Sequence, residues 1–327
     1  MTTFERRAAG LQDLPQMRNL LVERRARYGH GCWHTGDLTW RTFLMTIRNP
    51  LEETTRLWFD GDRLAGYALV DPPRRKDAGF DAQIHPDAMG SGIEEEMIDW
   101  GEAHWSARRA AWPQSRLLLD AGIYQDDRFF LNALRQRGWN DDHNDGRLLW
   151  RGLDQPMPAP TLPPGWSVRP VAGEAEAPRR AAVHRDTFHP SRVTDEQYLR
   201  LMRLSGYTPE LDLVTVSPEG EFGSFCLGWL DPVNRVGEFE PVGTHSAFRR
   251  RGLARAVIIE GLRRMQAAGA TGAVIGPIDV SDTQAMTLYE SLGFHAILKS
   301  SMYAKSLQAT DGIAHHPGML DQNRKEP

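Results

Sequence analysis

The chain has 327 residues, of which 40% are hydrophobic and 25% charged, a length and composition that fit two globular domains with buried cores. The net charge of −4 argues against a nucleic-acid-binding protein, which would need a basic excess. Met1 is not followed by an apolar segment, no run of eighteen apolar residues occurs, and the two cysteines lack metal-type spacing. We therefore expect a cytoplasmic protein with no metal site and no nucleic-acid or membrane partner.

Residues 1–150 predict a first domain in which strands and helices alternate. Apolar periodicity and short turns carry this prediction. The expected elements are a strand at 4–8, helical stretches, a strand pair at 55–59 and 64–70 around an Asp-Gly-Asp turn, a strand–turn–helix at 80–93, and a closing strand and helix that end at Gly138-Trp139.

Residues 151–165 contain five prolines and predict an extended linker, because proline cannot donate to a strand ladder. Residues 166–307 then repeat the order of the first half. The expected elements are a strand at 168–171, helical stretches, a strand pair at 211–216 and 223–230, a strand–turn–helix at 240–253, and a helix that ends at Gly293-Phe294. This internal repeat predicts two mixed α/β sheets with helices on both sides. Residues 308–327 are polar and aperiodic and predict a flexible tail.

The turn before the helix that starts near Leu253 is rich in arginine. Arg249, Arg250, Arg251 and Arg255 surround Gly252. The free N–H groups of a helix start and the positive end of its dipole favour an anion. Several guanidinium groups at that point suit a pyrophosphate better than a single carboxylate.

Two motifs carry a family resemblance. The spacing Arg249-x-x-Gly252-x-Ala254 resembles the acyl-CoA motif [RQ]-x-x-G-x-[GA] of the GNAT superfamily of N-acyltransferases. The segment from Asp282 through Tyr289 to Gly293-Phe294 resembles the second GNAT motif, N-x-x-A-x-x-L-Y-x-x-x-G-F. Asp282 stands where the family usually has asparagine.

The resemblance implies an α/β (α+β) fold of two tandem GNAT-like domains, each with a mixed, mostly antiparallel twisted sheet flanked by helices. The layout is similar to that of mycothiol synthases. It also implies acetyl-CoA as co-substrate, a small-molecule amine as acceptor, and a monomer or homodimer. The implied cofactor-binding residues are Val242, Thr244, Arg249, Arg250, Arg251, Gly252, Leu253, Ala254, Arg255 and Asp282.

The first half keeps the pattern of these motifs but loses their chemistry. Aligning the two strand–turn–helix segments places Met89 opposite Arg249 and Glu94 opposite Ala254, while Gly92 matches Gly252. Carboxylates suit a helix start but repel a pyrophosphate. Leu134 stands opposite Tyr289 and cannot donate a proton. We therefore predict a degenerate, non-catalytic domain at 1–150 and a catalytic domain at 166–307.

Glu238 and Glu240 are the candidate bases for acyl transfer. They lie two apart on the strand before the arginines, so both are expected on one face, where mutual repulsion would raise one pKa. Pro241 is expected to interrupt strand pairing and to free the N–H of Val242 for an oxyanion. The resemblance assigns Tyr289 as the acid that protonates the leaving thiolate.

Three functions agree with these residues. The favoured one is N-acetyl or short N-acyl transfer from acetyl-CoA to a small-molecule amine, directly within a ternary complex. A CoA-dependent sensor or ligand-sequestering protein without turnover is one alternative. An O- or S-acyltransferase on the same scaffold is the other.

Overall fold

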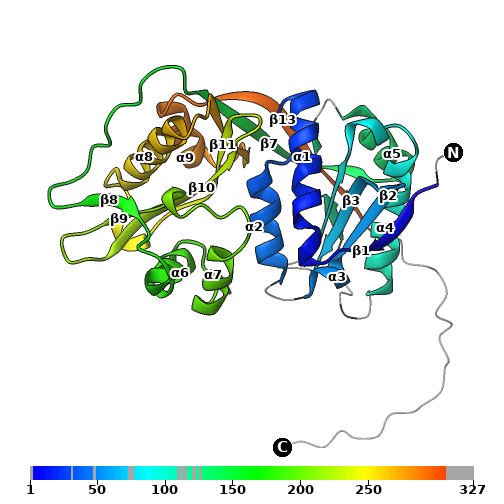
Figure 1. Ribbon diagram of the computed structural model, residues 1–327, viewed down its shortest axis with the longest axis horizontal. Helices are drawn as coiled ribbons and strands as arrows, with labels where there is room; N and C mark the ends of the chain where they lie inside the picture. Colours follow the sequence, from blue (N-terminus) through cyan, green and yellow to red (C-terminus); the bar gives the residue numbers. More distant parts are fainter. Residues whose placement is uncertain are drawn as a thin grey trace, which may run out of the picture.

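The computed structural model describes residues 3–30, 32–46, 49–72, 77–108, 111, 116–119, 123–124 and 127–306. The predicted tail at 308–327 lies outside these residues. Two lobes, one for each half of the chain, stand side by side, and the strands β7 and β13 run through the middle (Figure 1).

The first half follows the predicted order of elements. They are β1 (Glu5–Ala8), η1 (Leu11–Asp13), α1 (Leu14–Tyr28), α2 (Thr35–Thr46), α3 (Leu51–Thr54), β2 (Thr55–Asp60), β3 (Arg63–Asp71), β4 (Ala78–Ile84), η2 (Pro86–Ala88), α4 (Ile93–Ala107), β5 (Leu117–Leu119), β6 (Ile123–Tyr124), α5 (Arg128–Gln136) and β7 (Asn140–Gly152). The strand β3 reads as a nearly continuous apolar run and is buried on both faces, as a central strand covered on each side requires.

The second half repeats that order. Its elements are β8 (Ser167–Pro170), η3 (Glu174–Glu176), α6 (Ala177–Thr187), α7 (Asp195–Met202), η4 (Pro209–Leu211), β9 (Asp212–Val216), β10 (Phe222–Asp231), β11 (Val236–Thr244), η5 (Ser246–Phe248), α8 (Leu253–Ala267), β12 (Gly272–Asp279), α9 (Thr283–Ser291) and β13 (His295–Lys305). Helix α8 packs closely on the sheet at Gly261. A Cβ at this position would stand 2.4 Å from the ring of Phe239, so only glycine allows the close packing.

The two halves share one sheet, whose strand order is β1-β2-β3-β4-β5-β13-β7-β12-β11-β10-β9-β8. Strand β7, from the first half, pairs antiparallel with β12 and β13 of the second half. Strand β13, from the end of the second half, pairs antiparallel with β5 of the first. Each half therefore depends on the closing strand of the other for continuous pairing.

Side chains also join the halves beneath this sheet. Trp40 and Phe43 of α2 belong to one buried cluster with Tyr198, Leu227 and Trp229 of the second half. Burial of such large aromatic groups stabilises the contact between the halves.

The predicted fold class is confirmed: the structure is a mixed α/β fold with a large, mostly antiparallel sheet flanked by helices. The sequence predicted two sheets, and the structure joins them into one. The domain limits at 150 and 166 stay a prediction. Strand β7 continues to Gly152, two residues past the first limit.

Candidate active site

The neighbouring strands β11 and β12 part in the middle of the second half. Their parallel pairing joins Val236–Glu238 to Gly272–Val274, and no pairing of the two strands beyond Glu238 is seen among the described residues. On the other edge of β11, which faces β10, Val242 pairs with Cys226 and Phe239 pairs with Gly228. One residue of β10 therefore lies opposite two residues of β11. Strand β11 therefore has an extra residue at Glu240 and Pro241, a bulge of the kind that often lies beside active sites.

The helix α8 begins beside this opening with a turn suited to an anion. Gly252 is left-handed, with φ 79°, and Arg250 also has a positive φ of 60°. Gly252 offers no side chain to cap the helix, so the first-turn N–H groups of Leu253, Ala254 and Arg255 can meet a ligand. Arg249, Arg250 and Arg251 are exposed around them. The turn therefore fits the pyrophosphate of CoA.

Other predicted cofactor residues already have partners within the protein. Arg255 donates to the carbonyl and hydroxyl of Ser291, at 3.1 and 2.8 Å, and so ties α8 to α9. Asp282 accepts the Ala285 N–H at 2.9 Å and caps α9. The hydroxyl of Thr244 lies 3.0 Å from that of Ser224. These residues border the turn, and their contact with CoA stays a prediction.

The matching turn of the first half is filled by its own carboxylate. Gly92 starts α4 in the same left-handed conformation, with φ 98°. Glu94 is buried, and its Oε1 accepts the N–H of Gly90 at 2.7 Å. Burial raises the pKa of this carboxyl. A side chain of the protein therefore takes an N–H group of this turn.

Tyr289 lies on α9 against the core of the second half. Its ring is buried, with the centroid 6.0 Å from that of Phe294. Burial raises the pKa of its phenol, and the nearby charge of Glu240 raises it further. The phenol is therefore protonated at neutral pH and can donate, and Glu240 is close enough to influence it.

The two predicted bases differ in their surroundings. Glu240 is half-buried, and its backbone carbonyl accepts the indole N–H of Trp229 at 2.7 Å. Glu238 is buried against the first half of the chain, 2% exposed. Burial, followed by the charge of Glu240, raises the pKa of Glu238 to about 8. Glu240 is therefore the less buried of the two candidate bases.

Two residues of the first half, which the sequence had not singled out, contact Glu238. His34 Nδ1 lies 3.1 Å from Glu238 Oε2, and the Asp37 side chain hydrogen-bonds the Glu238 carboxyl. Both residues belong to the start of α2, where Asp37 accepts the backbone N–H of His34 at 2.7 Å. A His-x-x-Asp helix start could have indicated this cap, but not the strand that it would face.

Gly36 permits this close approach. A Cβ at Gly36 would stand 2.3 Å from the indole of Trp229 and 2.4 Å from Oε2 of Glu238. Real Cβ atoms do not come so close to other heavy atoms, so any larger residue would push α2 away from β11.

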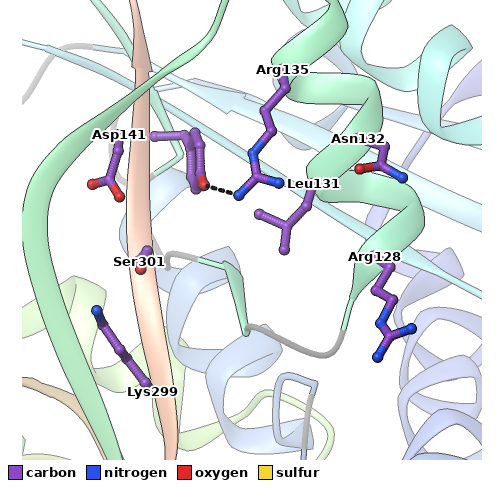
Figure 2. Close-up of a pocket in the computed structure, with 8 residues that line it drawn as sticks. Arg128, Leu131, Asn132, Arg135, Asp141, Lys299 and Ser301 are labelled. Atoms are coloured by element: carbon purple, nitrogen blue, oxygen red, sulfur yellow. Dashed lines mark hydrogen bonds between the residues drawn. The ribbon is translucent and has the colours of Figure 1, made fainter.

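A separate cavity of about 480 Å³ lies between α5 and the middle strands. Figure 2 shows Arg128, Asn132 and Arg135 on α5, across from Lys299 and Ser301 on β13. Arg135 donates to the hydroxyl of Tyr303, and Lys299 forms an ion pair with Asp145 at 2.7 Å. None of its lining residues belongs to the predicted site, and two of its three cations are already engaged.

Three features agree with an acyltransferase site. They are the parting of β11 and β12, the uncapped start of α8, and the buried phenol of Tyr289. Residues 181–294 match the acetyltransferase (GNAT) family. They are therefore a GNAT acetyltransferase domain, and the protein is an acyltransferase. The predicted family and enzyme class are confirmed.

Curated relatives and solved structures agree with this class. A mycothiol acetyltransferase of Kineococcus radiotolerans is 29% identical over 75% of this chain and 73% of its own length. A mycothiol acetyltransferase of Saccharopolyspora erythraea is 26% identical over 72% and 79%.

Among solved structures, a GCN5-related N-acetyltransferase from Sphaerobacter thermophilus is similar, with TM-score 0.63, 23% identity and coverage of 92% and 95%. A tandem GNAT protein from the clavulanic acid biosynthesis pathway has TM-score 0.58, 15% identity and coverage of 93% and 98%. At these identities the likeness concerns the fold. Among the described residues, no helix is long and apolar enough to cross a membrane.

Proposed function

We propose that the second half transfers an acetyl or short acyl group from acetyl-CoA to the amine of a small molecule, directly within a ternary complex. The observation that carries this proposal is the uncapped, arginine-flanked start of α8 beside the parting of β11 and β12. The first turn of a helix binds phosphate through backbone N–H groups, and the parted strands leave room for an extended acyl thioester.

The residues around the opening divide the chemistry. Glu240 accepts a proton from the substrate ammonium, and the neutral amine nitrogen attacks the thioester carbonyl carbon. The backbone at Val242 stabilises the oxyanion that forms. The carbon–sulfur bond then breaks, and Tyr289 gives its proton to the departing thiolate. The former amine nitrogen gives up its second proton, which restores the phenol and leaves the neutral amide. The raised pKa of Tyr289 keeps that proton in place until the transfer.

The acceptor is the less defined partner. The six curated relatives that match are named mycothiol acetyltransferases, so an amine acceptor related to mycothiol is the first to test. The half-buried side chain of Glu240 suits an acceptor that arrives as a cation. Amine antibiotics form the second class of acceptor in the panel.

The test is acetyl-CoA consumption by the full chain over this amine panel, with product masses. We expect one amine to gain the mass of an acetyl group, and Gly252→Glu to abolish the reaction by placing a carboxylate in the phosphate approach. CoA binding without turnover on any acceptor would favour the sensor. An ester or thioester product would favour the O- or S-acyltransferase.

We expect Glu240→Gln to remove the acidic limb of the kcat/KM profile, because it removes the group whose deprotonation frees the amine. Loss of that limb in Glu238→Gln instead would move the base two residues back along β11. An unchanged profile in both variants would mean that the carboxylates only hold the substrate.

A further inference from the structure

The cavity between α5 and β13 is polar, and none of its lining residues belongs to the proposed acyl-transfer site. Its volume of about 480 Å³ is typical of sites that hold small molecules. Helix α5 of the first half forms one wall and β13 of the second half forms the other (Figure 2). Most small-molecule sites are lined mainly by apolar side chains. Here Leu131 is the one aliphatic side chain among the described lining residues, which indicates a polar ligand.

The wall formed by α5 is cationic because of the spacing of its residues. Asn132 and Arg135 follow Arg128 by four and seven positions, so the three side chains lie on one face of the helix. The other face carries Phe130 and Leu134 into the core of the first half. The sequence of α5 therefore places two guanidinium groups and an amide at the cavity.

Neither guanidinium group forms an ion pair within the part of the chain that the structure describes. Arg135 donates to the hydroxyl of Tyr303 at 3.2 Å, and a neutral hydroxyl leaves the positive charge uncompensated. By contrast, Arg137, just past the end of the same helix, makes two hydrogen bonds to Asp99 at 2.6 and 3.1 Å. Lys299 is neutralised by its ion pair with an aspartate. The two cavity-facing arginines therefore remain to attract an anion.

The opposite wall supplies hydroxyl groups and one carboxylate. Ser301 and Tyr303 of β13 are buried, 8% and 5% exposed, and form the floor of the cavity. Asp141 of β7 is the strand partner of Tyr303. Figure 2 shows Asp141 on the other side of β13 from the α5 residues. The carboxylate, which accepts hydrogen bonds only, therefore lies apart from the two guanidinium groups.

This separation of charge suits a ligand with an anionic end and a hydroxylated body. Arginine binds phosphate through its fork of N–H groups. A hydroxylated ring can donate to Asp141 and exchange hydrogen bonds with Asn132 and Ser301. A dicarboxylate would bring a second negative charge toward Asp141. An apolar anion would cover these polar groups without giving them partners, which is costly.

We propose that this cavity binds a small sugar phosphate, with Arg128 and Arg135 at the phosphate and Asn132, Ser301 and Asp141 at the hydroxyl groups. The proposal is independent of the proposed acyl transfer, because the two sites share no residue. Since α5 and β13 come from different halves of the chain, an occupied cavity would also link the halves.

Calorimetric titration of the full chain at fixed ionic strength tests the proposal. Glucose 6-phosphate and ribose 5-phosphate are the probes, and inorganic phosphate and glucose represent the two parts of the ligand separately. We expect one sugar phosphate per chain, bound more tightly than either part alone. Binding should also raise the melting temperature, because a ligand of the folded chain stabilises it by mass action.

Variants identify where the probe binds. Arg128→Gln and Arg135→Gln should each weaken sugar-phosphate binding about 10- to 100-fold, because each removes a charge-assisted hydrogen bond to the phosphate. Arg27→Gln, at an exposed arginine of α1, is the matched control and should leave the affinity unchanged. Arg249→Gln, at the start of α8, should also leave it unchanged. Circular dichroism checks that each variant is folded.

The proposal is overturned if neither sugar phosphate binds the wild type, or if both cavity variants bind it as the wild type does. Weaker binding in Arg249→Gln alone would place the phosphate at the α8 turn and overturn the proposal as well. Equal affinities for inorganic phosphate and the sugar phosphates would overturn the sugar assignment. Absence of acyl transfer to every amine would count against the proposed function and leave these titrations standing.

Discussion

Replacing Glu238 with glutamine should change stability in a pH-dependent way. Burial and the charge of Glu240 raise the pKa of Glu238 from 4.5 to about 8 in the folded protein. Below pH 4.5 the folded and unfolded chains both carry the proton. As the pH rises toward 8 the unfolded chain ionises while the folded chain does not. The free energy of unfolding of the wild type therefore falls over this range and levels off above it.

The difference of 3.5 between the two pKa values, at about 1.4 kcal/mol for each pKa unit, corresponds to about 5 kcal/mol. Glutamine cannot ionise, so Glu238→Gln loses none of this. Its hydrogen-bonding cost is the same at every pH. We expect the stability of Glu238→Gln relative to wild type to rise by several kcal/mol between pH 4.5 and 8.

Urea unfolding at pH 5, 6.5 and 8 measures this difference. The buried histidines remote from Glu238, whose pKa values are lowered, titrate in the same range with the opposite sign and cancel in the difference. His34 contacts Glu238, so any change in its titration is part of the measured effect. Glu290→Gln is the matched control, and its difference from wild type should not grow with pH. A difference that is flat with pH for Glu238→Gln as well would refute the assignment of a neutral Glu238.

Three further predictions concern the second half. Tyr289→Phe keeps the ring and its packing but removes the proton, so the turnover number should fall by about 100- to 10,000-fold with little change in melting temperature; an unchanged rate at the chemical step would make Tyr289 a core residue only. Calorimetric titration should give one CoA per chain, lost in Gly252→Glu and retained in Met89→Ala; two sites would contradict the degenerate first half. Residues 166–327 alone should aggregate because β12 loses β7, and residues 138–327, which retain β7, should be more soluble; a monomeric, active 166–327 fragment would contradict this.

The local features of the site could be predicted from the sequence because short segments specify them. A strand, a glycine-bearing turn and an apolar-periodic helix follow each other within twenty residues, and the left-handed Gly252 appears where the motif placed it. The sequence also indicated a carboxylate at the matching helix start of the first half, and Glu94 there accepts the Gly90 N–H.

The exchange of β7 and β13 could not be predicted in the same way. The apolar pattern of a strand indicates which face is buried, but it does not choose between two similar sheets. Because the two halves repeat each other, the sequence patterns of the closing strands β7 and β13 suit the edge of either sheet. Their positions depend on pairings between residues far apart in the chain, such as Ala304 with Leu118.

The contact of His34 and Asp37 with Glu238 was missed for a related reason. Each residue has a complete local explanation as part of a helix cap, so nothing in the sequence pointed to a second role. The first half nevertheless supplies the strand that completes the other sheet, and the start of its helix α2 contacts a buried carboxyl group. Since Gly36 permits that contact, Gly36→Ala should disturb the acidic limb of the catalytic half from a position that touches no substrate, and an unchanged limb would show that the two helix-cap residues act on packing alone.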